Sequence, residues 1–261
     1  MKKQKLAVCV LSAALMIGAA TLTSYAAEGW QQSGNSWIYV DNNGNKVTNT
    51  WKKGADNLWR YLDSQGNIAS NCWVDDEYFV ESTGIMATDK WLKLPKRNPA
   101  WNETSATTVW YYFSTSGKMV SDGSKIGGKY YYFDGDGAMQ TGWVDDDTYY
   151  TNADGVMQIG WAYLEDPDDT KKDDDEVKPG DDDEDHHWYY FQSSGKKYVP
   201  SLGGAKYKQY KIDGTYYCFD ENGAMQTGWV DMGNSSGFAN YRYYQSNGQV
   251  QTGWLSTTPP E

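Results

Sequence analysis

Aromatic side chains are the residues of this sequence whose type and spacing could do chemistry. The chain has 13 Trp, 22 Tyr and 6 Phe among 261 residues. Many stand at fixed offsets before a recurring glycine, as Tyr130 and Tyr132 do before Gly137. Ring faces attract cationic ammonium groups and also pack against apolar surfaces. The pattern predicts ring-lined binding sites, and the alternative is that the same rings form only a core.

Other chemistry has little support in the sequence. The only histidines are the adjacent His186 and His187, which leaves no base for a nucleophilic Ser or Cys elsewhere. Asp145 and Asp147 could serve as a carboxylate pair, but they lie in a short spacer where we expect no deep cleft. We therefore predict no catalytic residue, no enzyme activity and no cofactor.

The acidic run at 165–185 raises the question of a metal site. It holds 13 acids and three lysines, and clustered carboxylates are ligands that calcium accepts. The run lacks the ordered spacing of a calcium loop, and neighbouring histidines in an extended segment seldom converge on one ion. We favour a solvated, disordered insertion and predict no metal site, with weak calcium binding as the alternative.

The elements that position the rings repeat along the chain. Alignment on the turn glycine gives nine copies, centred on Gly44, Gly66, Gly84, Gly117, Gly137, Gly155, Gly195, Gly223 and Gly248. The columns seven and five residues before the glycine share one face of a strand, and the columns six and four before it share the other. An Asp- and Gly-rich turn follows, and then a return strand that begins near a methionine. Each copy is thus predicted to be a β-hairpin.

Short hairpins are marginal alone in water, so the copies must stack and share their aromatic faces. We predict an all-β solenoid of about nine stacked hairpins. In this solenoid a Gly-Trp ring, a ring of its neighbouring strand and a ring of the next copy would converge at each joint. The joints are the expected binding sites.

The chain divides into four predicted segments. Residues 1–26 resemble a cleaved secretory signal, with lysines before an apolar run. Residues 27–164 hold repeats 1–6 and the start of repeat 7, residues 165–187 form the acidic insertion, and residues 188–261 hold repeats 7–9 and a terminal cap. No other long apolar stretch exists, so we expect a secreted protein without a transmembrane anchor. The net charge of -12 argues against nucleic acid as a partner.

Two segments carry a family resemblance. Residues 128–143 (GKYYYFDGDGAMQTGW) and 214–229 (GTYYCFDENGAMQTGW) resemble the cell-wall-binding, or choline-binding, repeats of Gram-positive surface proteins. The resemblance implies that the hairpins coil into a left-handed superhelix. It also implies that choline of wall teichoic acid sits in aromatic cages between consecutive hairpins, and that the protein is associated with the cell wall.

The same resemblance implies particular cage residues. The pattern is best kept where Trp30 and Trp37 would face Tyr61, and where Trp51 and Trp59 would face Phe79. Less complete groups are formed by Trp143 with Tyr150 and by Trp229 with Tyr241 and Tyr243. Glu77 and Thr148 replace the strand aromatic in two copies.

Three functions are compatible with these observations. The first is a secreted, non-catalytic protein that binds a choline-bearing wall polymer through several cages. The second is binding of a carbohydrate or glucan, such as a surface glycan, by stacking on the same rings. The third is a structural stalk or adhesin whose rings are all core. The oligomeric state stays open.

Overall fold

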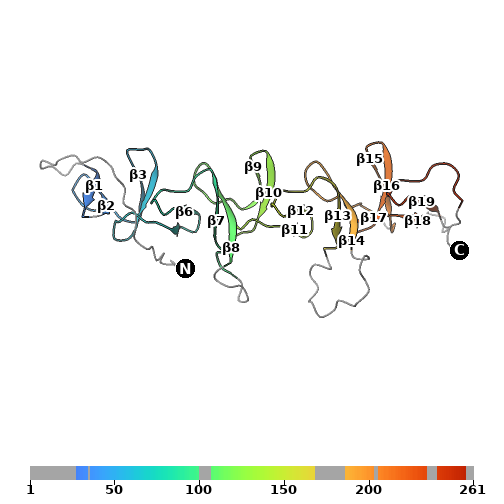
Figure 1. Cartoon of the computed structure of the whole chain (residues 1–261), viewed down its shortest axis with the longest axis horizontal. Coiled ribbons are helices and arrows are strands. Elements are labelled where there is room, and N and C mark those ends of the chain that lie inside the picture. The colour runs from blue at the N-terminus through green and yellow to red at the C-terminus, as the bar shows by residue number, and fades with distance from the viewer. Residues whose placement is uncertain are drawn as a thin grey trace. The chain divides into compact units, whose positions relative to one another are not determined.

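The computed structural model describes residues 28–34, 36–99, 107–167, 186–202, 205–233 and 240–256 (Figure 1). The predicted signal segment at 1–26 and most of the acidic insertion at 165–187 lie outside these residues. Within them, the chain consists of strands and turns and contains no helix. No segment of the described chain is therefore a helix long and apolar enough to cross a membrane.

The strands form antiparallel hairpins in chain order, which confirms the all-β, hairpin-repeat prediction. The described part of the chain holds β1 (Gly29–Ser33), β2 (Ser36–Val40), β3 (Thr50–Lys53), β4 (Trp59–Leu62), β5 (Cys72–Val74), β6 (Tyr78–Val80), β7 (Lys90–Pro95), β8 (Thr108–Phe113), β9 (Asp122–Ile126), β10 (Lys129–Phe133), β11 (Gly142–Val144), β12 (Tyr149–Thr151), β13 (Gly160–Glu165), β14 (His186–Phe191), β15 (Lys208–Ile212), β16 (Thr215–Phe219), β17 (Met225–Gln226), β18 (Gly228–Asp231) and β19 (Tyr241–Tyr244).

The register of these hairpins differs from the sequence prediction. We expected each aromatic strand to pair with the return strand after its Asp-Gly turn. Instead, the Trp-containing segment before it forms the longer ladder, as in β3 and β4, where Trp51 lies opposite Tyr61. The return segment makes only an isolated bridge, such as that between Leu62 and Ile68. β17 is the exception, because it extends this bridge to two pairs.

The Asp-Gly turn closes through its own side chain. The Asp134 carboxylate accepts hydrogen bonds from the amides of Asp136 (3.0 Å) and Ala138 (2.9 Å), and the Gly137 amide donates to the Asp134 carbonyl (2.9 Å). Gly137 has a φ of 81°, a left-handed conformation that glycine adopts without the strain of a Cβ. The turn residues read from the sequence therefore have a direct structural cause.

Consecutive copies are joined by one recurring backbone hydrogen bond. The residue two positions after a turn glycine donates its amide to the carbonyl seven positions before the turn glycine of the preceding copy. Met119 donates in this way to Glu77 (2.7 Å), and Lys197 donates to Thr148 (2.8 Å). The return segment pairs with the preceding copy through this bond, which explains why it makes so little ladder with its own strand. Because a carbonyl is the acceptor, Glu77 and Thr148 replace an aromatic side chain without loss of the bond.

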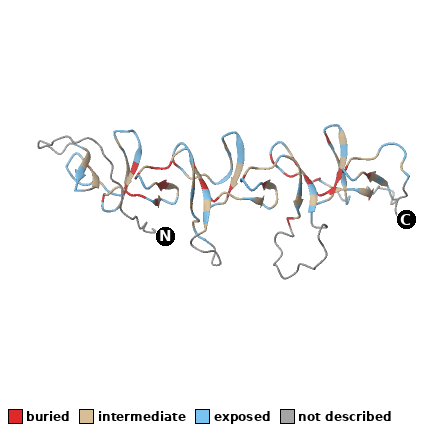
Figure 2. Cartoon of the chain, viewed as in Figure 1, coloured by how far each residue is buried: buried red, intermediate tan, exposed pale blue. Residues whose placement is uncertain are grey.

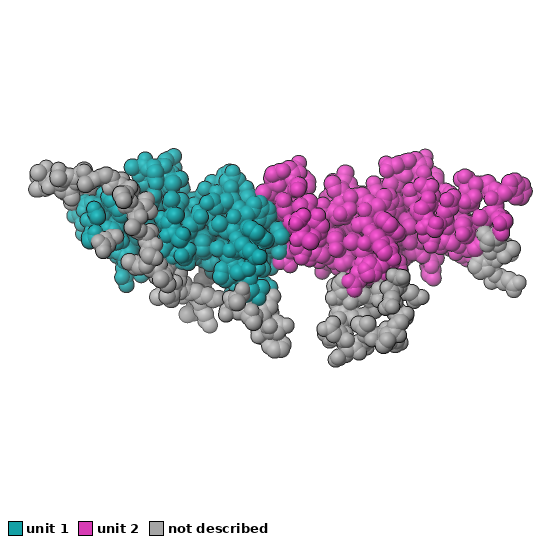
Figure 3. All heavy atoms as spheres, in the orientation of Figure 1, with its two compact units in different colours: residues 1–124, 133–139 teal, residues 125–132, 140–261 magenta. Residues whose placement is uncertain are grey.

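The described residues fall into two compact units (Figure 3). Unit 1 comprises the described residues up to Ser124 together with Phe133–Met139, and unit 2 comprises Lys125–Tyr132 and the described residues from Gln140 onward. The division passes through the hairpin of β9 and β10.

The buried residues in the described part of each unit form several small clusters and not one large core (Figure 2). In unit 1, Phe79 packs with Tyr111 and Phe113. In unit 2, Tyr189 and Phe191 pack with Ala224. Cys72 and Cys218 are also buried. Because each cluster draws on adjacent hairpins, the repetition of the sequence supplies the packing that one hairpin lacks.

Candidate aromatic ligand sites

Three rings from two hairpins meet at the second joint of the chain, in unit 1. Trp51 on β3 contacts Tyr61 on β4, with ring centroids 5.1 Å apart. It also contacts Tyr78 on β6 of the next hairpin, at 5.6 Å. The planes meet at 63° and 64°, so the Trp51 ring meets both neighbours edge to face. All three rings are partly exposed, which leaves ring surface accessible to a ligand.

Unit 2 contains a corresponding joint. Trp161 on β13 contacts Tyr190 on β14 at 5.2 Å and Tyr217 on β16 at 4.7 Å. Phe219 is buried and stacks on Trp161 at 5.9 Å, with an interplanar angle of 15°. Trp161, Tyr190 and Tyr217 are partly exposed, like the three rings of the Trp51 joint. We call these two groups the open joints: Trp51–Tyr61–Tyr78 and Trp161–Tyr190–Tyr217.

One rule describes how the joints are built. Each contains the Trp on the first strand of a hairpin, the ring five positions before the turn glycine of the same hairpin, and the ring six positions before the next turn glycine. Trp91 follows the first part of the rule by contacting Tyr112 at 5.1 Å, and it also stacks on Phe133 at 5.7 Å. The Tyr112 hydroxyl donates to the Asp89 carboxylate, and this hydrogen bond raises the pKa of Tyr112.

Two further joints share this arrangement but are filled. Trp73 contacts Phe79 (5.4 Å), Tyr111 (5.1 Å) and Phe113 (5.5 Å) in unit 1. Phe79 is 7% exposed, and Tyr111 and Phe113 are fully buried. Burial is also the main cause of the raised pKa of Tyr111. Most of the ring surface at this joint is therefore part of the core. This agrees with the alternative in the sequence analysis, in which the rings form a core and not a binding site.

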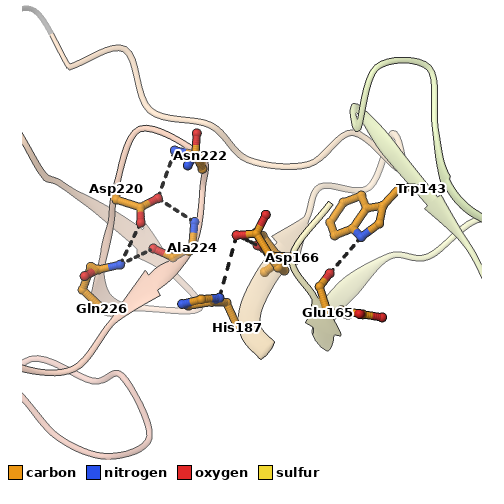
Figure 4. A network of polar contacts seen from close by, with 9 residues as sticks. Trp143, Glu165, Asp166, His187, Asp220, Asn222, Ala224 and Gln226 are labelled. Atoms are coloured by element: carbon orange, nitrogen blue, oxygen red, sulfur yellow. Dashed lines mark hydrogen bonds and ion pairs between the residues drawn. The ribbon is translucent and has the colours of Figure 1, made fainter. Parts of the chain in front are cut away.

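The second filled joint lies in unit 2. Trp143 contacts Tyr150 (5.3 Å), Tyr189 (5.1 Å) and Phe191 (5.8 Å). Tyr189 and Phe191 are fully buried, and the Trp143 indole donates to the Glu165 carbonyl at 2.9 Å (Figure 4). We call the groups around Trp73 and Trp143 the closed joints.

The first predicted cage is not assembled as the sequence indicated. Trp30 packs edge to face on Tyr39 at 5.4 Å and donates its indole N–H to the Lys53 carbonyl at 2.7 Å. Tyr61 belongs to the Trp51 joint, and Trp37 lies opposite Gln32 in the β1–β2 ladder. In the second hairpin, the position six residues before the turn glycine is Arg60 and not an aromatic residue. The first joint therefore lacks the third ring that the rule requires.

The second predicted cage is also regrouped. Trp59 is 38% exposed and has the Lys53 ammonium 5.1 Å from its ring centroid. Phe79 packs on Trp73 in a closed joint, whereas Trp51 joins Tyr61 and Tyr78. Trp51 is therefore a joint residue as predicted, but its partners are different.

The structure does bring together the remaining predicted residues. Trp143 and Tyr150 lie in one closed joint, opposite each other in the β11–β12 ladder. Trp229 contacts Tyr241 at 6.5 Å and Tyr243 at 5.3 Å within the hairpin of β18 and β19. The buried indole N–H of Trp229 has no hydrogen-bond partner among the described residues.

Sequence reasoning missed the column six residues before the turn glycine. This column supplies Tyr78 and Tyr217 to the open joints and Tyr111 and Tyr189 to the closed ones. It is Tyr in every copy from Gly84 to Gly223 and Arg at Arg60 and Arg242. That regularity was a usable signal. The sequence analysis places this column on the face away from the joints, whereas the pairing of each Trp-containing segment with the following strand brings it to the Trp of the preceding hairpin.

Unit 2 also contains a polar region beside its joints. An open cavity of about 620 Å³ is lined by Asp146, Asp147, Thr148, Asp166, Pro167, Gln192, Lys196, Lys197, Val199, Glu221 and Asn222. Figure 4 shows the contacts nearby, including His187 Nδ1 at 4.0 Å from Asp166 Oδ2 and the Gln226 amide donating to Asp220 at 3.0 Å. Within the described ranges, no group of three or more His, Cys, Asp or Glu is arranged to hold a metal ion.

The fold and the joints define a class: an all-β protein of repeated hairpins whose aromatic rings meet between neighbours. The comparison with protein families makes this more specific. A family model described as a cell wall binding repeat, of the choline-binding type, matches residues 28–46, 109–119, 125–139 and 185–197. These four segments thus match the cell-wall-binding, or choline-binding, repeat, which confirms the resemblance found in the sequence.

Solved structures support the fold. The choline-binding domain of CbpL from Streptococcus pneumoniae matches with a TM-score of 0.55 and 22% identity, over 88% of this chain and 100% of that one. The modular autolysin LytC from Streptococcus pneumoniae, in complex with a synthetic peptidoglycan ligand, matches with a TM-score of 0.55 and 21% identity. That match covers 86% of this chain but 46% of LytC. A search of curated proteins found no match.

Proposed function

We propose that this chain is a secreted, non-catalytic protein that attaches to choline-bearing polymer of the cell wall. The two open joints, Trp51–Tyr61–Tyr78 and Trp161–Tyr190–Tyr217, are the proposed choline sites. This proposal replaces the cage residues implied by the resemblance with those that the geometry groups together. It keeps Trp51 and Tyr61 and adds the missed column.

The observation that carries the proposal is the partial exposure of three converging rings at each open joint. The trimethylammonium group of choline cannot donate a conventional hydrogen bond, so ring faces are the natural partners for it. In the described part of the chain, no lysine or arginine lies over the ring of Trp51 or Trp161. These faces are thus available for an external cation.

The expected affinity explains why the sites are repeated. One cation–π contact is worth about 0.5–2 kcal/mol, so three rings give roughly 2–5 kcal/mol, or about millimolar affinity. One joint alone would hold the wall weakly. Two joints on one chain that face a polymer with repeated choline gain avidity through effective concentration.

Two of the similar structures support this function. One is a choline-binding domain, and the other was solved with a peptidoglycan ligand. LytC is an autolysin, and this chain spans less than half of its length. The non-catalytic role is proposed from the sequence, whose two histidines are adjacent and lie at the end of the acidic run.

Retention on a choline-mimicking amine resin tests the assignment. The double variant Trp51→Ala, Trp161→Ala should lose most retention, because each change removes the central ring of an open joint. The double variant Trp37→Ala, Trp59→Ala removes two Trp rings outside those joints and should be retained. Circular dichroism and urea unfolding would show that both variants are folded. Equal retention of the two folded variants would refute the proposed sites.

A second candidate is the binding of a surface glycan. The polar cavity in unit 2 favours it, because the side chains of Asp147, Gln192 and Asn222 line an open space that could accept hydroxyl groups. Binding of purified peptidoglycan or of an array glycan that free choline does not displace would support this function. Complete displacement by choline would favour the aromatic joints.

A further inference from the structure

The two closed joints have a feature that the repeat pattern does not require. In unit 1, the guanidinium carbon of Arg97 lies 4.7 Å from the centroid of the Trp73 ring. In unit 2, the Lys197 ammonium lies 4.9 Å from the Trp143 ring and 5.4 Å from the Tyr189 ring. All three distances fall within the range of a cation–π contact.

The two cations reach equivalent rings by different routes. Arg97 comes from the segment between β7 and β8, where the sequence inserts residues between the two strands of a hairpin. Lys197 stands two positions after Gly195, a position that is methionine at Met86, Met119, Met139, Met157 and Met225. Since no shared repeat position supplies both cations, their common location is not a by-product of the repeat.

Arg97 is held firmly at its joint. Its side chain is 12% exposed, and its guanidinium pairs with the Asp76 carboxylate at 2.9 Å. It also donates to the Asp76 carbonyl at 2.7 Å, while the Arg97 amide donates to the Tyr111 hydroxyl at 2.9 Å. One residue therefore binds the hairpin of Trp73 and the buried ring of the next hairpin together.

Lys197 departs from the packing of its counterparts. In several other copies the side chain at this position lies against the turn glycine of the next copy, as Met157 does at Gly195 and Met225 at Gly248. Gly223, the next turn glycine after Lys197, is approached instead by Tyr198 and Val199. Lys197 is 8% exposed, and its ammonium lies at the rings of Trp143 and Tyr189.

We infer that Arg97 and Lys197 are built-in ligands that close two of the aromatic joints. Each cation occupies the Trp face that an external quaternary ammonium group would use, so these residues determine which joints bind ligand. This inference rests on the proposed function, in which the open joints bind choline. It predicts that removing the internal cation converts a closed joint into a binding joint.

The experiment follows the indole N–H signal of each Trp by NMR during titration with choline chloride. In the natural sequence, the signals of Trp51 and Trp161 should respond saturably, and those of Trp73 and Trp143 should not. Lys197→Ala should give Trp143 a saturable response, which adds one site. Arg97→Ala should do the same for Trp73 in the other unit. Addition of Trp143→Phe to Lys197→Ala identifies the new signal.

The neighbouring lysine provides a matched control. Lys196 is exposed and lies over neither the Trp143 nor the Tyr189 ring. Lys196→Ala removes the same charge and should leave Trp143 unresponsive. A response with both lysine variants would indicate an effect of net charge and overturn the inference.

The outcomes separate the inference from the proposed function. If Trp51 and Trp161 respond but neither Lys197→Ala nor Arg97→Ala adds a site in a folded protein, the inference fails and the proposed function stands. If the natural sequence shows no response and Lys197→Ala gains one, the proposed choline sites fail and the internal-ligand assignment stands. No response in any folded variant would overturn both.

Discussion

Gly137 lies directly against the Met119 side chain of the preceding copy. A Cβ built on Gly137 would meet the sulfur and carbon atoms of Met119 at distances that real Cβ atoms do not show. The same relationship joins Gly117 to Met86. The turn glycine is thus fixed by two constraints, its left-handed backbone and the methionine of its neighbour, and this accounts for the Gly-x-Met signature of the repeat.

Gly137→Ala should destabilise the protein. The substitution introduces a Cβ at positive φ and forces Met119 to move, and we expect a loss of about 1–3 kcal/mol. Urea unfolding measures it. Gly135→Ala is the matched control in the same turn, because Gly135 is exposed and a Cβ there meets nothing within 4 Å. Equal loss for both variants would show that the contact with Met119 does not matter.

The ion pair of Asp56 and Arg60 should make unit 1 sensitive to acid. Hydrogen bonds from the Arg60 guanidinium, at 2.6 and 2.9 Å, lower the pKa of Asp56 from 3.8 to about 2. The stabilisation is therefore complete above the unfolded pKa of 3.8 and is lost as the pH falls from there toward about 2. Urea midpoints should decline across this window in the natural sequence and decline less in Asp56→Asn.

The same variant should also cost stability near neutral pH. Arg60 is 2% exposed, and without the carboxylate its buried guanidinium loses its charged partner. We expect a loss of about 1–3 kcal/mol. Arg60→Met, which removes the buried charge and keeps an apolar side chain, should cost less than Asp56→Asn. The reverse order in urea unfolding would contradict this account.

The thiol of Cys218 should be unreactive in the native protein. Burial raises the pKa of Cys218 to about 11, so at pH 8 only about one thiol in a thousand is a thiolate. In a Cys9→Ser, Cys72→Ser background, alkylation should be about a hundredfold or more slower in buffer than in concentrated urea. Comparable rates in the two conditions would show that the Cys218 site opens readily.

The third ring of an open joint should act through its face and not through its hydroxyl. Tyr78→Phe keeps the ring and should preserve the response of the Trp51 indole to choline. Tyr78→Leu removes it and should weaken binding at this joint by about 2- to 30-fold, the equivalent of one cation–π contact. The Trp161 joint serves as the internal reference. Equal affinities for the two variants would exclude Tyr78 from the site.

The sequence predicted the repeat, the all-β class and the turn chemistry because these depend on local patterns. The spacing of Asp134 and Gly137 is enough to define a turn, and the columns of rings are enough to define strands. The family resemblance also implied ligand sites between copies, and this stays a prediction.

The sequence did not predict the grouping of rings, because this depends on contacts between copies. The amide of Met119 donates to the carbonyl of Glu77 in the preceding copy, and β8 pairs with β7, the strand that contains Trp91. As a result, Trp73 of the preceding hairpin contacts Tyr111, from the column six residues before the turn glycine of the next copy, and not the ring from the column five residues before that glycine. The roles of Arg97 and Lys197 were also invisible, because no periodic signal marks a side chain that reaches another copy's ring.

Both long interruptions of the repeat leave and re-enter their hairpins at cross-strand partners, Pro95 with Thr108 and Glu165 with His186. Each of these pairs is the last pair of its β-ladder. The sequence between the two partners can therefore change in length and composition without displacing the aromatic rings on the paired strands. The hairpin tips are therefore sites where foreign sequence can be grafted onto an anchoring scaffold. Arg97 illustrates the consequence, because a graft at such a tip can also reach back and regulate the joint beneath it.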